Sequence, residues 1–257
     1  MKDLYRLFNI EFAKWLVFIA ILCAAAIVAP LVLLHNQVKH YSEYSVTQRF
    51  EDVYAASGSQ LLFLVFLALV CAYFLKTLYA DYWGSKGIYT YLTLPVKRET
   101  LYFSRLIAFA TCLLLLLASQ LLSIRLGYAL YASKVASYGE GQFVMHNGYF
   151  LAMIRSDFFR LLLPLSFSRL LSSLGLFLSI ATGFYYGVLC ERSRKRYGFA
   201  AILIAWVTAF NAAGYRLHEG QEYGDPGSLY VSSAIMLVLS GWFVWHSLRI
   251  LKRGAIA

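Results

Sequence analysis

This sequence has few charged residues for its length. Asp, Glu, Lys and Arg together make up 14% of its 257 residues, whereas soluble globular domains carry about 25%. Hydrophobic residues make up 60% of the chain. So few charged side chains cannot cover a water-facing surface. The composition therefore excludes an ordinary soluble domain and indicates a membrane protein.

Cysteine is also scarce, and the usual motifs of catalysis are missing. No CxxC pair occurs, and no histidine lies at metal-ligand spacing from a cysteine. The chain has no GxxxxGK[ST] phosphate loop, no HExxH helix and no GxSxG turn. We expect no catalytic residue, no metal and no cofactor, so an intramembrane enzyme is the weakest hypothesis. Cys23, Cys71 and Cys112 lie inside apolar runs, and Cys190 lies at the end of one. We therefore expect all four to be small buried apolar residues.

Long apolar runs are what the chain does have. Six stretches of about 20 residues lack Asp, Glu, Lys and Arg, which is the length that crosses a bilayer. These runs must be helical, because lipid offers no water to satisfy backbone groups. We predict an all-α polytopic membrane protein, one domain over residues 1–257 with no soluble domain attached. The predicted spans cover residues 16–35, 58–80, 101–132, 168–190, 197–216 and 227–248.

The formal net charge is +10, and the position of the basic residues predicts orientation. They do not form one patch, so we expect no nucleic-acid partner. They lie at the ends of apolar runs, and the strongest cluster is residues 191–196. If the N-terminus is inside, more Lys and Arg fall in inner than in outer segments. The positive-inside rule therefore predicts that both ends lie in the cytoplasm.

Residues 1–15 precede the first span and read as an amphipathic helix. Leu4, Phe8, Phe12 and Trp15 recur at helical spacing. Such a helix would lie in the inner membrane interface before the chain enters the bilayer.

Two segments leave alternatives open. Residues 148–168 are apolar but contain Arg155, Asp157, Arg160 and Pro164, so we expect a surface helix or a shallow re-entrant piece and no span. Arg125 lies near the outer end of the third span. It snorkels to the interface there, or, if the helix continues to about residue 132, it lies within the helix and faces a protein interior.

The inner loop over residues 81–100 is the most informative segment. Gly84 and Gly87 let the chain turn after the second span. Ile88, Tyr91 and Leu92 then fall at helical spacing, which predicts a short helix with an apolar face, and Pro95 marks a new helix start. An ordinary amphipathic connector on the lipid surface has the same pattern.

The run over residues 87–98 reads Gly-Ile-Tyr-Thr-Tyr-Leu-Thr-Leu-Pro-Val-Lys-Arg, and Arg105 follows at the base of the next span. This run resembles the first cytoplasmic loop of type-2 ABC transporter permeases. That family also has an amphipathic N-terminal helix, six spans, both ends inside and no ATPase domain. The resemblance implies that the loop docks in a groove of a separate ATPase subunit. The implied docking residues are Lys86, Ile88, Tyr89, Tyr91, Leu92, Leu94, Pro95, Lys97 and Arg98.

The resemblance implies a function and partners. The chain would be the membrane subunit of an ATP-driven exporter of a peptide, antibiotic or lipid-like substrate. It would not itself hydrolyse ATP, and it would pair with an ABC ATPase and a second permease copy among the lipids of a bacterial cell membrane. The alternative is a non-transport scaffold or sensor subunit, with residues 40–54 and 148–168 as its recognition surface.

Overall fold

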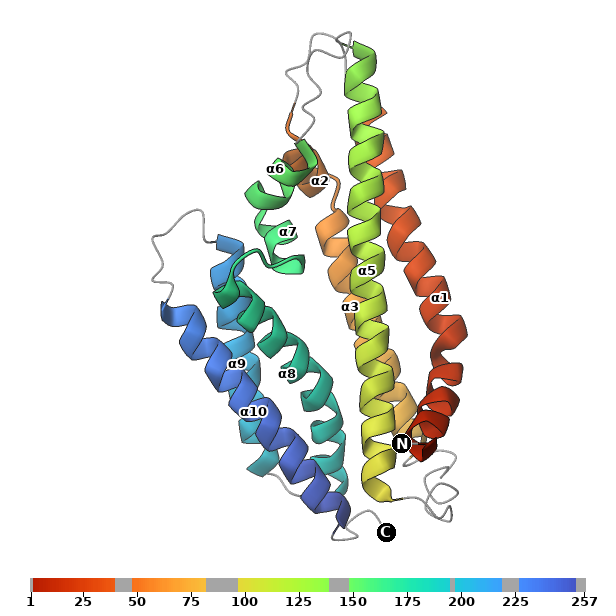
Figure 1. The fold of residues 1–257 in the computed structure, drawn as a ribbon, viewed down its shortest axis with the longest axis vertical. Coiled ribbons are helices and arrows are strands. Elements are labelled where there is room, and N and C mark those ends of the chain that lie inside the picture. The colour runs from red at the N-terminus through yellow and green to blue at the C-terminus, as the bar shows by residue number, and fades with distance from the viewer. Residues whose placement is uncertain are drawn as a thin grey trace. The chain divides into compact units, whose positions relative to one another are not determined.

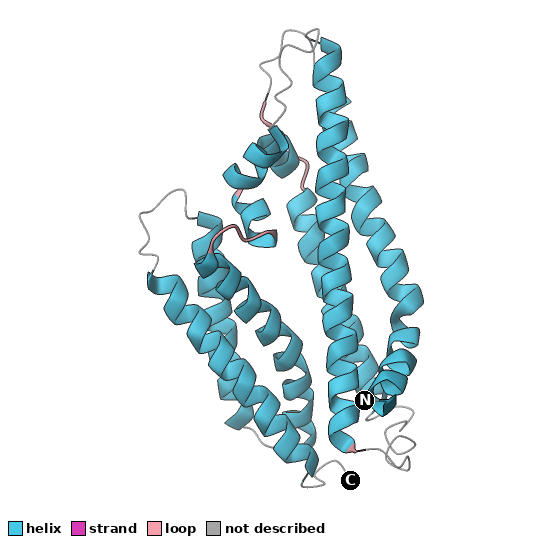
Figure 2. Cartoon of the chain, in the orientation of Figure 1, coloured by secondary structure: helices cyan, strands magenta, loops and turns pink. Residues whose placement is uncertain are grey.

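The computed structural model describes residues 2–39, 48–81, 97–138, 148–194, 197–218 and 227–252. Throughout these residues the regular structure is helical and no strand is present (Figure 2). The predicted all-α fold class is confirmed for this part of the chain.

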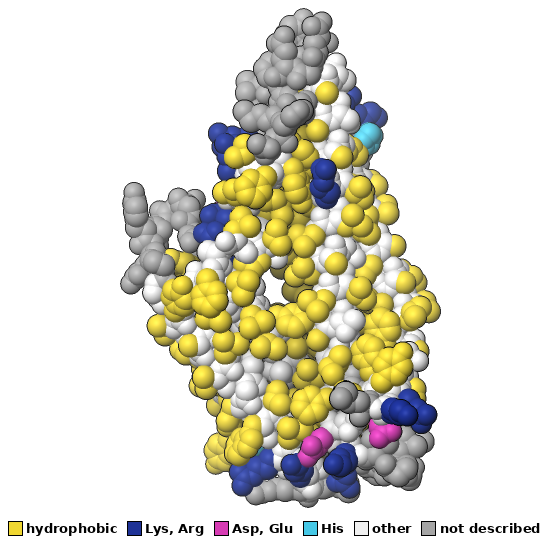
Figure 3. Space-filling model, in the orientation of Figure 1, with side chains coloured by type: hydrophobic (Ala, Val, Ile, Leu, Met, Phe, Trp, Pro, Cys, Tyr) yellow, Lys and Arg dark blue, Asp and Glu magenta, His cyan; other side chains and the backbone are white. Residues whose placement is uncertain are grey.

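Six of the described helices are long and apolar enough to cross a membrane, as predicted. They are α1 (Lys2–Lys39), α3 (Ser59–Tyr79), α5 (Arg98–Tyr138), α8 (Phe167–Arg192), α9 (Tyr197–His218) and α10 (Gly227–Lys252) (Figure 1). Hydrophobic side chains cover their middle stretches, and Lys and Arg gather near the helix ends (Figure 3). This is the pattern of a multi-pass membrane protein. The orientation of the helices stays a prediction.

Two helices are much longer than a bilayer requires. α1 has 38 residues and α5 has 41, or about 57 and 62 Å at 1.5 Å per residue, against a hydrocarbon core of about 30 Å. Residues 2–15 belong to α1 and continue into the span without a break. Their location in the membrane interface stays a prediction. α5 continues past residue 132, yet Arg125 is exposed and does not face the interior.

The charged segment after α5 forms two short helices, α6 (Gly148–Arg155) and α7 (Asp157–Leu162). They are separated at Ser156, whose Oγ accepts a hydrogen bond from the backbone N–H of Phe159 at 3.4 Å. Ser156 is therefore the N-cap of α7. Neither helix is long enough to cross a bilayer, in agreement with the exclusion of this segment from the spans.

The chain groups into two compact units. Unit 1 consists of Met1–Leu16, Val70–Cys112 and Ser166–Ala257, and unit 2 of Val17–Leu69 and Leu113–Leu165. In unit 1, α8, α9 and α10 pack side by side (Figure 1). Buried serines lie in α8 and α10, and the Oγ atoms of Ser179 and Ser240 are 3.3 Å apart. Such small side chains let two helix backbones approach closely.

Aromatic rings fill the rest of unit 1. Phe74 of α3 and Phe109 of α5 stack with centroids 4.0 Å apart. Tyr102 of α5 stacks on Tyr185 of α8 at 4.8 Å, and Trp15 of α1 meets Tyr73 edge-on at 4.8 Å. These contacts join four helices around one buried aromatic layer.

Unit 2 has an aromatic core with one polar pair inside it. The short helix α2 (Phe50–Ala56) contributes Phe50 and Tyr54, which contact Phe159 of α7 with centroids 6.0 and 5.1 Å away. Gln120 of α5 is fully buried and donates from Nε2 to the Tyr54 hydroxyl at 2.6 Å. Burial raises the pKa of the Tyr54 phenol far above its usual value, and hydrogen bonds to Gln120 and Ser59 oppose that shift only in part.

We expect Tyr54→Phe to lower the free energy of unfolding by about 1–2 kcal/mol, because the buried Gln120 amide loses its acceptor. The double variant Tyr54→Phe with Gln120→Leu removes both polar partners and should recover most of that loss. Unfolding by SDS in mixed micelles measures the free energy of unfolding of the single and the double variant. A double variant that is less stable than Tyr54→Phe alone would show that the pair is not the source of the effect.

Candidate functional site

The predicted docking residues divide into two groups. Lys86, Ile88, Tyr89, Tyr91, Leu92, Leu94 and Pro95 lie outside the described residues. Lys97 and Arg98 are described, and both are exposed. The Lys97 carbonyl accepts a hydrogen bond from the Thr100 N–H at 2.9 Å, which closes the first turn of α5. The structure therefore describes only the two ends of the predicted coupling loop, at Asp81 and at Lys97 and Arg98.

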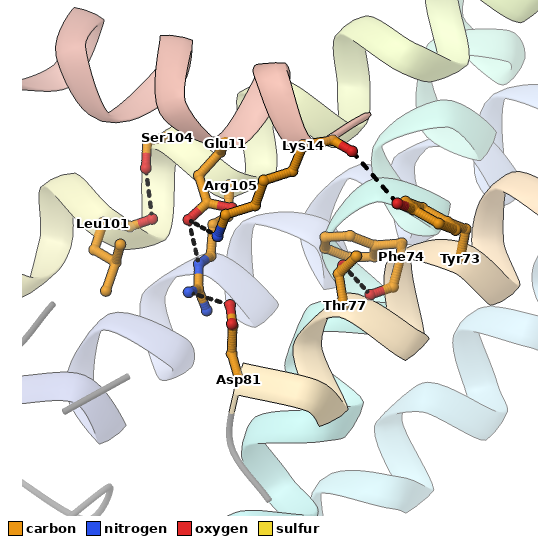
Figure 4. A network of polar contacts seen from close by, with 9 residues as sticks. All are labelled: Glu11, Lys14, Tyr73, Phe74, Thr77, Asp81, Leu101, Ser104 and Arg105. Carbon is orange, nitrogen blue, oxygen red and sulfur yellow. Dashed lines mark hydrogen bonds and ion pairs between the residues drawn. The ribbon is translucent and has the colours of Figure 1, made fainter. Parts of the chain in front are cut away.

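The first end of the loop is held by a buried ion-pair network in unit 1 (Figure 4). Asp81, two residues after the end of α3, binds Nη2 of Arg105 through Oδ2 at 2.5 Å. Oε1 of Glu11 in α1 lies 3.5 Å from Nε of the same guanidinium. Lys14 is 3.3 Å from Oε2 of Glu11. One arginine of α5 thus connects the N-terminal part of α1 to the start of the loop.

Burial makes this network energetically important. Arg105 is 3% exposed and Glu11 is 5% exposed. Charges removed from water need partners, since the cost of leaving one unpaired in the interior is high. The formal charges of Glu11, Asp81, Lys14 and Arg105 balance, so the network has no net charge. The surrounding rings weaken solvent screening and strengthen the attraction.

A cavity of about 10 Å³ lies at the network. That volume is about the size that one water molecule occupies. Its walls are formed by Glu11, Trp15, Phe74, Thr77, Leu78, Asp81, Arg105 and Ala108. The space is too small for a substrate, so we interpret the network as a structural connection.

The second end of the loop is held against α10. The Arg98 Nη1 donates to the Leu251 carbonyl at 3.4 Å. A basic side chain at the C-terminus of a helix satisfies a free carbonyl and interacts favourably with the helix dipole. The next residue, Glu99, pairs with Lys252 at 2.9 Å. Both contacts fix the start of α5 to the last turn of α10.

A further contact joins α3 to α8 just before the loop. The Tyr79 hydroxyl donates to the Glu191 carboxylate. The ends of α1, α3, α5, α8 and α10 within unit 1 are therefore connected through the residues that flank the loop.

The sequence analysis singled out Arg105 and the loop that begins at residue 81, but it missed Glu11. The amphipathic reading placed Leu4, Phe8 and Phe12 on the apolar face, and these three are only partly buried. The fully buried row in this part of α1 is Leu7, Glu11 and Trp15. An acidic residue one turn from each of two large apolar residues is the signal that could have found it.

Among the described residues, no three His, Cys, Asp or Glu side chains come together to hold a metal ion. No protein-family model, curated protein or solved structure matches this chain. The resemblance to type-2 ABC permeases therefore depends on the loop residues and the helix pattern alone.

Proposed function

We propose that this chain is the membrane subunit of an ATP-driven ABC transporter of the type-2 permease kind. It exports a peptide, antibiotic or lipid-like substrate across a bacterial cell membrane. It works as a dimer with a second permease, identical or similar, and two ATPase subunits. Both chain ends and the loop over residues 81–100 lie on the cytoplasmic side.

One observation carries the proposal beyond the resemblance. Both ends of the loop make polar contacts with the helices of unit 1, by Asp81–Arg105 before it and by Arg98–Leu251 and Glu99–Lys252 after it. A loop that receives movement from an ATPase needs rigid attachments, because slack at its ends would absorb the displacement. A simple surface connector has no such requirement.

The test is copurification of the partner from the native host. The wild-type chain, extracted in mild detergent, should bring down an ATPase subunit that mass spectrometry identifies by its phosphate-loop motif. The double variant Tyr91→Ala with Leu92→Ala should reduce that ATPase to background, because it removes the apolar anchors that the resemblance assigns to docking. Both proteins should reach the membrane in equal amounts.

The matched control is Tyr230→Ala with Val231→Ala, which removes an aromatic and an aliphatic side chain that are exposed in the first turns of α10. It should retain the ATPase. Absence of any ATPase from the wild-type preparation would sink the transporter proposal, and a different membrane partner in its place would favour the scaffold alternative. Equal ATPase recovery with both double variants would refute the docking role.

A further inference from the structure

The helices α6 and α7 of unit 2 are too short to cross a bilayer, and this segment has both buried and exposed apolar side chains. One side packs into the aromatic core. Phe158 and Phe159 are buried there, and the Phe158 ring contacts Phe63 of α3 with centroids 5.9 Å apart. This side fixes α6 and α7 to the spanning helices of the same unit.

Large apolar groups are exposed in α6 and in the stretch that follows α7. In α6, Phe150 is 58% exposed and Ile154 40%; after α7, Leu163 is 42% exposed and Leu165 47%. Exposed apolar side chains in one stretch of chain mark a contact with something other than water. The spanning helices of unit 2 also expose large apolar side chains, among them Leu61, Leu64, Leu122 and Leu126.

Cationic groups accompany this apolar surface. Arg125, exposed on α5, lies over the ring of Tyr149 in α6, with 5.1 Å between the guanidinium carbon and the ring centroid. The side chain of Arg155, at the end of α6, is 48% exposed and 4.0 Å from Glu51. Arginine and tyrosine side by side are typical of the headgroup layer, where the ring meets acyl chains and the cation meets phosphate.

Backbone hydrogen bonds are retained at the break between α6 and α7 and at the end of α7. At the break between the helices, Ser156 caps α7, and the Leu163 N–H donates to the Phe159 carbonyl at 2.8 Å. A segment that enters a lipid interface needs this, since acyl chains offer no hydrogen bonds.

We propose that α6 and α7 lie in the headgroup layer of the membrane as an interfacial anchor. Phe150, Ile154, Leu163 and Leu165 insert among the acyl chains, and Arg125 and Arg155 contact phospholipid phosphates. The partner is a phospholipid surface and not a second protein, because the spanning helices of the same unit also expose large apolar side chains, as helices that face lipid do. This inference holds whether or not the chain is a transporter.

The test uses the full chain in nanodiscs of phosphatidylcholine and phosphatidylglycerol, with the four native cysteines replaced by alanine. Nitroxide labels are placed at Phe150→Cys and Leu163→Cys. Leu64→Cys in α3 serves as the lipid reference and Ser137→Cys, exposed near the end of α5, as the water reference. Collision rates with oxygen and with a nickel chelate report lipid and water contact.

We expect the ratio of oxygen to nickel collisions at residues 150 and 163 to exceed that at residue 137 several-fold and to lie below that at residue 64. Nickel access equal to that at residue 137 means a water-facing segment. Exclusion of both reagents means a protein contact, such as a second copy. Either result overturns the proposal.

A second measurement tests the phosphate contact. Arg125→Leu should let the label at residue 150 sink deeper, which raises the collision ratio several-fold, and Arg125→Lys should leave the ratio near its starting value. Equal ratios for both variants would show that the cation does not set the depth.

Discussion

Arg105→Met should lower the free energy of unfolding by about 3–5 kcal/mol, which is the cost of breaking a buried ion pair by removing one partner. Glu11 and Asp81 then lose the guanidinium that lies between them. SDS titration in mixed micelles measures the change, and tryptophan fluorescence can follow it because Trp15 borders the same cavity.

The triple variant Arg105→Met, Glu11→Gln and Asp81→Asn is the sharper comparison. It removes the three charges that meet at the guanidinium and leaves only Lys14, whose side chain is 39% exposed, and replacement of a buried ionic group as a unit is often close to neutral. We expect it to regain most of the lost stability. Arg98→Gln is the matched control at an exposed arginine and should cost less than about 1 kcal/mol. Equal losses from Arg105→Met and Arg98→Gln would contradict the importance of burial.

The number of spans could be predicted from sequence because lipid imposes a simple rule. Every crossing needs about 20 apolar residues in a helix, and a run of that length is visible without an alignment. The ends of the helices are harder to predict from the sequence. α5 begins at Arg98 and ends at Tyr138, beyond the predicted span over residues 101–132, because hydropathy detects the lipid-facing part and not the helix that extends past it.

The short helix α2 of unit 2 escaped prediction for a different reason. The second span was predicted over residues 58–80, and no helix was predicted before it, but Phe50–Ala56 forms the separate helix α2. Gly58 has φ of +74° in the turn between α2 and α3, a conformation that glycine adopts without strain. The turn residue was visible in the sequence, but its conformation was not.

The ion-pair network could be predicted only in part, because it depends on contacts between distant residues. Arg105 and Asp81 are separated by 24 positions, and both drew attention as flanks of the loop. Glu11 lies much farther away in sequence, and only the packing of α1 against α3 and α5 brings it to Arg105. Tertiary partners of buried charges leave no local pattern.

Gly198→Ala should lower the free energy of unfolding by about 2–3 kcal/mol, at the upper end of overpacking costs. A Cβ at this position, in the first turn of α9, would clash with the Sγ of Cys190 and lie 2.8 Å from the Tyr186 hydroxyl. Both residues are fully buried in the cluster that joins α8, α9 and α10. They have little room to move, so α9 would have to separate from α8.

A double-mutant cycle and a matched glycine make this result specific. Cys190→Ala removes the clashing sulfur and leaves its Cβ 3.3 Å from the new methyl group, so Gly198→Ala should cost about 1 kcal/mol less in that background. The matched control is Gly214→Ala in the same helix, where the new Cβ has no neighbour within 4 Å. It should stabilise the chain by about 0.5–1 kcal/mol, because alanine is the better helix residue. If Gly198→Ala behaves like Gly214→Ala in the SDS titration, the close approach of α8 and α9 at this point is wrong.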